Sequence, residues 1–65
     1  MSDHDENAAI ELIARELIQQ HGADAAWRAR ARADDEGNRG NFPAAVRWRL
    51  IADTIERLQD SSEAS

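Results

Sequence analysis

The sequence predicts a single small all-α domain, built as a compact bundle of three short helices. Alanine is abundant, β-branched residues are sparse and tyrosine is absent, a composition that favours helix over strand. Apolar residues recur at spacings of three and four, as on one face of a helix. With 65 residues and no cysteine, the chain depends on helix packing or self-association for stability. The alternative architecture is a helical hairpin that dimerises into a four-helix bundle.

The first helix is predicted near residues 6–20, after a loose start over 1–5. Its apolar face is expected to comprise Ala9, Ile10, Ile13, Ala14 and Leu17. His21-Gly22 has the composition of a helix end, because glycine adopts the left-handed conformation at little cost. One continuous helix through Gly22 would cost about 1 kcal/mol for the interior glycine. We therefore favour a break at this point.

The second helix is predicted near residues 24–36, with Asp24 as a candidate N-cap. Its apolar side consists mainly of alanine, which permits close helix approach but contributes little burial per residue. Three arginines each have an acidic residue four positions away, a spacing that stabilises a helix by roughly 0.2–0.5 kcal/mol per pair. The expected pairs are Asp24–Arg28, Arg30–Asp34 and Arg32–Glu36.

The third helix is predicted near residues 43–59 and has the clearest pattern in the chain. Residues 37–41 are rich in glycine and asparagine and form the preceding loop. Pro43 fits the first turn, with Asn41 or Phe42 as the cap. A heptad-like seam is formed by Ala44, Trp48, Ile51, Ile55 and Leu58. The polar tail over 60–65 is expected to fray.

Four aliphatic residues do not belong to these predicted core faces. Val46 and Leu50 stack on each other at i,i+4, well outside the seam, and Leu12 and Ile18 are off the face of the first helix. Contiguous exposed apolar area often marks an interface. We therefore predict these four residues as an interface, with a symmetric homodimer as its commonest form. A wider core that absorbs Leu50 is the alternative.

The charge is unevenly distributed along the chain. The net charge is −5 overall, with −5 over residues 1–27, +3 over 28–49 and −3 over 50–65. Overall acidity argues against non-specific nucleic-acid binding, although a local basic patch could still act. The candidate patch for an anionic partner comprises Arg28, Arg30, Arg32, Arg39, Arg47 and Arg49. Trp48, between two of these arginines, would add stacking for RNA.

We predict no catalytic residue, no cofactor and no metal site. The serines lie near the ends of the chain, where no base and orienting group can be held. His21 has no histidine or glutamate four residues away, as a helical metal site requires. With Met1 removed, Ser2-Asp3-His4 could bind Cu(II) or Ni(II) through its nitrogens. This signature needs only one histidine, so we favour a solvated acidic tail.

Two stretches carry a resemblance to a known group of proteins. They are His21-Gly22-Ala23-Asp24-Ala25 and the helix from Trp48 to Leu58. Together they resemble short uncharacterised α-proteobacterial helical proteins with an HG-x-x-A turn and a W-x-x-I-A terminal helix. The resemblance covers roughly residues 9–58, and the loop over 37–41 departs from the commoner Gly-Asp pair. It implies a small helical domain in the bacterial cytoplasm and brings no activity.

The sequence thus predicts a small interaction or regulatory module that acts by protein–protein contact. The partner is expected to be a second copy or another protein. No apolar run is long enough to span a membrane and the N-terminus lacks a signal pattern, so a cytoplasmic location is expected. The alternative is a nucleic-acid-associated protein that uses the central arginines.

Overall fold

The computed structural model describes the backbone of residues 2–64 and the side chains of residues 7–60. It contains α1 (Ser2–His21), a 3₁₀ turn η1 (Gly22–Asp24), α2 (Ala25–Asn38) and α3 (Phe42–Ala64), and no strand over the residues described. The predicted all-α class is confirmed. Helix covers 2–5 and 60–64, where the sequence predicted loose ends. The side chains of Ser2, Asp3 and His4 lie outside the described part.

The predicted break at Gly22 is confirmed. Helix α1 ends at His21, and Gly22 takes a φ of +60°, a left-handed conformation that glycine adopts without a Cβ clash. The side-chain amide of Gln59 in α3 donates a hydrogen bond of 2.9 Å to the carbonyl oxygen of Gly22. The turn between α1 and α2 is therefore fastened to the C-terminal half of α3.

The turn between α2 and α3 is a Schellman motif centred on Gly40. Asn41 N–H donates to the Glu36 carbonyl at 2.9 Å, and Gly40 N–H donates to the Gly37 carbonyl at 3.0 Å. Gly40 has the positive φ, +82°, that the motif requires. The Asn41 carbonyl then accepts the N–H of Ala45, so Asn41 is also the residue that caps α3.

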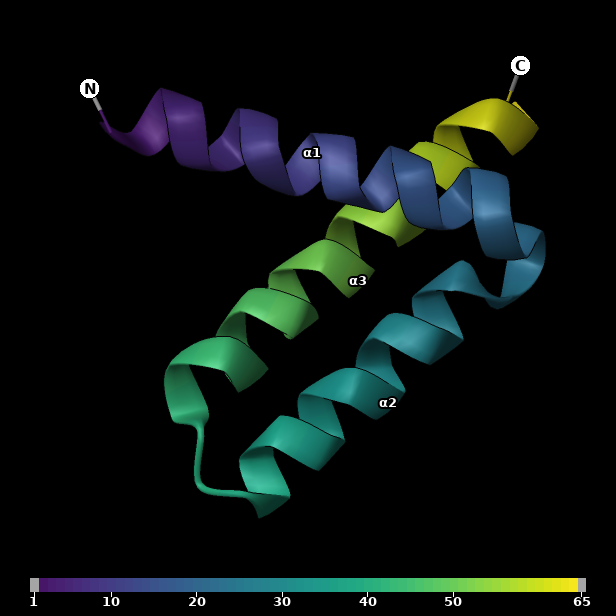
Figure 1. Cartoon of the computed structure of the whole chain (residues 1–65). Coiled ribbons are helices and arrows are strands. Elements are labelled where there is room, and N and C mark those ends of the chain that lie inside the picture. Colours follow the sequence, from purple (N-terminus) through teal and green to yellow (C-terminus); the bar gives the residue numbers. More distant parts are fainter. Residues whose placement is uncertain (1, 65) are drawn as a thin grey trace.

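Helices α2 and α3 form an antiparallel hairpin, and α1 crosses α3 near its C-terminal half (Figure 1). The predicted seam of α3 is confirmed, because Ile51 and Ile55 are buried and Trp48 and Leu58 pack against them. Among residues 7–60, whose side chains are described, the buried apolar residues are Ile10, Ala14, Ala25, Ala29, Ala33, Ile51, Ala52 and Ile55. Five of these eight are alanine, so the core is closed by close helix approach more than by large side chains.

The buried face of α1 differs from the predicted one. Ala14 is fully buried, and Ile10, Leu17 and Ile18 pack around it. Ile13, predicted in the core, is 36% exposed. Ile18, predicted outside, joins the core. The reason is geometric: α1 contacts the hairpin through a face centred on the small Ala14, and at 100° per residue Ile18 is closer to this centre than Ile13 is.

The three helices form a flat molecule. Its extents are 39 × 31 × 17 Å, and its radius of gyration is 12.0 Å, against about 10.7 Å for a compact domain of this length. The accessible surface is 5050 Å², against about 4200 Å² for a folded monomer of 7.3 kDa. The isolated chain therefore exposes about 850 Å² more surface than a compact monomer would.

Candidate functional site

An exposed apolar ridge follows the outer side of α3. Phe42, Val46 and Leu50 are 67%, 58% and 48% exposed, respectively. Their i,i+4 spacing places them in one row along the helix. The seam residues of α3 face the other helices, so the same helix carries two apolar rows on different sides. We call Phe42, Val46 and Leu50 the outer ridge.

A groove borders each side of the outer ridge. The first, of about 600 Å³, lies between the ridge and α1 and is lined by Ile10, Asn41, Pro43, Ala44, Val46, Arg47, Trp48 and Leu50. The second, of about 570 Å³, lies between the ridge and the end of α2 and is lined by Ala33, Asp34, Gly37, Asn38, Phe42, Ala45, Val46 and Arg49. A ridge between two grooves is the shape that packs against another helix.

Three of the four predicted interface residues have the expected exposure. Leu12 is 64% exposed, and Val46 and Leu50 belong to the outer ridge. Ile18 is the correction, because it packs against the core. Phe42 was not among the predicted interface residues, although its spacing of four from Val46 indicates the same row. The alternative of a core wide enough to absorb Leu50 does not match its 48% exposure.

The predicted arginine patch is divided between different partners. Arg30 forms an ion pair with Glu56 of α3, and Arg39 pairs with Asp35 at 3.5 Å. The Arg32 guanidinium lies 5.3 Å from the ring centroid of Trp48. Two of the expected pairs within α2 are therefore replaced by contacts that join α2 to α3. The buried alanines of α2 form one row, and residues 30 and 32 lie on opposite sides of it. The two contacts therefore lie along the two edges of the α2–α3 interface.

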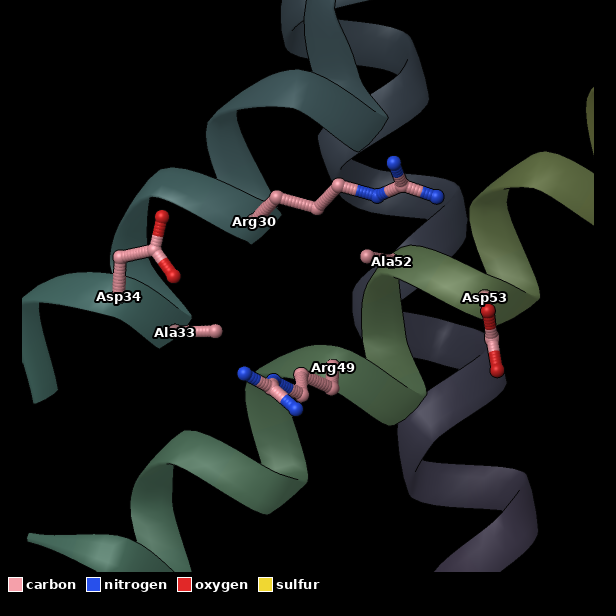
Figure 2. Close-up of a pocket in the computed structure, with 6 residues that line it drawn as sticks. All are labelled: Arg30, Ala33, Asp34, Arg49, Ala52 and Asp53. Atoms are coloured by element: carbon pink, nitrogen blue, oxygen red, sulfur yellow. The ribbon is translucent and has the colours of Figure 1, made fainter. Parts of the chain in front are cut away.

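A small cleft between α2 and α3 brings charged groups of both signs together. Figure 2 shows Arg30 on α2 and Arg49 on α3, with Ala33 and Ala52 between the two arginines in this view. The cleft has a volume of about 380 Å³, and its lining also includes Asp34 and Asp53. Two guanidinium groups and two carboxylates balance, and Arg30 already has Glu56 as its partner. The cleft is thus a poor site for a free anion.

The remaining candidates for chemistry are dispersed. His21 is half-buried at the end of α1. Among the described residues, no group of three or more metal-ligating side chains comes together. No helix in that part of the chain has the length and apolar content needed to cross a bilayer. The Trp48 ring, which the RNA alternative would use for stacking, has Arg32 over it.

The chain matches no protein-family model, no curated protein and no solved structure.

Proposed function

We propose that this chain is a protein–protein interaction module without catalytic activity, and that the outer ridge of α3 is its docking surface. The observation that carries the proposal is the exposed apolar row of Phe42, Val46 and Leu50 between two grooves. Burying large apolar side chains contributes about 25 cal/mol per Å² of apolar surface removed from water. A partner helix laid along the ridge would gain this contribution.

The chemistry of the grooves supports binding rather than reaction. Their linings combine aliphatic and aromatic side chains with amides, the carboxylate of Asp34 and two arginines, Arg47 and Arg49, and include no histidine. An apolar centre with a polar margin that includes arginine is typical of protein interfaces. The bacterial cytoplasmic setting and the resemblance to the short α-proteobacterial proteins remain part of this proposal.

The alternative, a nucleic-acid-associated protein, has less support. Binding to phosphates requires several arginines free to neutralise them on one face. Arg30 and Arg39 already pair with carboxylates, and Arg32 lies over Trp48. If purified protein carries nucleic acid, or shifts RNA or DNA in a gel at low salt, this alternative gains the support that it now lacks.

Site-directed photo-cross-linking in the native cells tests the proposed docking surface. A photoreactive amino acid replaces Leu50, which is 48% exposed on the outer ridge. The matched control replaces Ala31, which is exposed on the side of α2 opposite its buried alanines. We expect the probe at position 50 to form a covalent adduct of one discrete mass, and the probe at position 31 to form none.

Mass spectrometry of that adduct identifies the partner, whether it is a second copy or a different protein. The adduct should disappear when Val46→Glu is added beside the probe, because a charge on the ridge opposes its burial. If the probe at position 50 forms no more adduct than the probe at position 31, the proposed docking surface is wrong.

A further inference from the structure

We infer that the partner of the outer ridge is a second copy of this chain, bound so that α1 of each copy packs on α3 of the other. The inference rests on the proposed function and names the partner for the same surface. It has three supports in the structure: a complementary face on α1, opposite charges on the two faces, and an excess of exposed surface of the appropriate size.

The outer face of α1 is the second apolar surface of the molecule. Leu12 is 64% exposed, and Ala8 and Ala9 beside it are exposed as well. Glu16 stacks on Leu12 at i,i+4 and is exposed. Its carboxylate forms no ion pair with any residue whose side chain is described. Leu12, Ala8 and Ala9 therefore form a small apolar patch, and Glu16 places a negative charge beside it.

The charges favour α1 of the second copy, and not its α3, as the helix that covers the ridge. Residues 1–27 carry a net charge of −5 and residues 28–49 carry +3. Arg47 and Arg49 line the grooves on the two sides of the ridge. Packing two ridges together would bring the Arg49 side chains of the two copies close, and like charges across an interface oppose association. The acidic α1 brings the opposite sign.

The position of α1 makes this contact accessible. Leu12 and Glu16 lie on the side of α1 opposite the buried Ala14, and the N-terminal end of α1 extends beyond the α2–α3 hairpin in Figure 1. A face that projects in this way can reach a second molecule without any change in the fold of the first. Because a two-fold dimer uses each contact twice, α1 of each copy would cover the ridge of the other.

The area matches what a stable dimer needs. The chain exposes about 850 Å² more than a compact monomer of its mass. A standard protein interface buries about 800 Å² on each partner.

Size-exclusion chromatography with light scattering tests the inference directly. The chain should have a mass near twice 7.3 kDa at high concentration. The double substitution Val46→Glu with Leu50→Glu should reduce the mass to one chain while the helical circular dichroism signal stays. A parent chain that remains monomeric at millimolar concentration overturns the inference.

A charge exchange tests which faces meet. Arg49→Glu should raise the dimer dissociation constant about tenfold, because the reversed charge acts twice in the dimer. Adding Glu16→Arg should restore most of the loss. Arg28→Glu makes the same charge change on an exposed residue of α2, outside both grooves, and should leave the constant unchanged. A dimer that responds equally to Arg28→Glu and Arg49→Glu, with no rescue, contradicts the α1–α3 contact.

The two proposals fail in different ways. A monomeric chain that still forms a discrete adduct at position 50 in cells refutes the homodimer and leaves the docking surface intact, with another protein as partner. A monomeric chain without that adduct refutes both.

Discussion

The inner and outer sides of α3 show two different uses of apolar residues. On the inner side, α3 meets α2 through small residues, with Ala29 and Ala52 only 1% and 2% exposed. Ion pairing by Arg30 and stacking by Arg32 close the margins of that contact. On the outer side, Val46 and Leu50 are larger than these alanines, yet they are 58% and 48% exposed. Val46 and Leu50 are thus not the side chains that close the α2–α3 contact.

This difference shows how a short chain can divide one helix between folding and binding. Alanine permits close approach of two helices, and dispersion contacts accumulate where the packing is tight. Larger aliphatic side chains on the other side then remain available for a partner. Substitutions should therefore have large effects on folding at the inner positions, and small effects on folding but large effects on association at the outer ones.

The largest effect on folding is expected for Ile51→Ala, in the centre of the inner seam. Ile51 is 2% exposed, and truncation of a buried isoleucine costs at least about 2 kcal/mol of unfolding free energy. In a domain of this size that is a large part of the total stability. Urea denaturation followed by circular dichroism measures the change. An unaltered midpoint would mean that the inner seam does not hold the fold.

A smaller loss is expected for Ala29→Leu, which overfills the alanine contact. Ala29 is 1% exposed, and extra methylenes in a tight contact cost about 1–3 kcal/mol. Ala31→Leu adds the same side chain on the exposed side of α2 and should change the unfolding free energy by less than about 0.5 kcal/mol. Denaturant titration of both variants compares them. Equal effects would contradict the close α2–α3 approach.

Two glycines near the turn between α2 and α3 should respond to alanine with opposite changes in stability. Gly40→Ala should cost about 1–2 kcal/mol, because an L-residue is strained at a φ of +82°. Gly37→Ala, inside α2, should add about 0.5–1 kcal/mol to the stability. An added Cβ meets no atom within 4 Å at either position, so only the backbone differs. Thermal unfolding of the pair checks this contrast, and changes of the same sign would refute it.

The smallest effect is expected at the margin of the α2–α3 contact, for the pair Arg30–Glu56. The two side chains are 61% and 40% exposed, so solvent screens their attraction and the coupling should be under about 1 kcal/mol. A double-mutant cycle with Arg30→Gln and Glu56→Gln, repeated at high salt, measures it. A coupling well above this value that salt does not reduce would show that the pair is more than a marginal contact.

The helices and the division of α3 could be predicted from the sequence, because both follow from spacing. Ile51 and Ile55 share the seam, whereas Val46 and Leu50 fall outside it at 100° per residue. The choice between Ile13 and Ile18 in α1 could not be predicted. It depends on the rotation at which α1 crosses the hairpin, and the fully buried Ala14 at that crossing has a weak signal in an alanine-rich chain.

The partners of the arginines could not be predicted from the sequence, for a related reason. Spacing within α2 predicts pairs such as Arg30–Asp34, whereas the structure pairs Arg30 with Glu56, 26 residues away. A pair across two helices depends on their register, which no local pattern contains. The same holds for the two grooves, since each is lined by residues of α3 together with residues of α1 or α2.

The central claim, that the outer ridge is a docking surface for a second copy of the chain, can be tested by thiol labelling of Leu50→Cys at increasing protein concentration. The chain has no cysteine of its own, so one introduced thiol is an unambiguous probe. We predict that labelling at position 50 slows as the concentration rises, while labelling of Ala31→Cys keeps a constant rate. Equal and constant rates at both positions, up to millimolar protein, would contradict coverage of the ridge by a second copy.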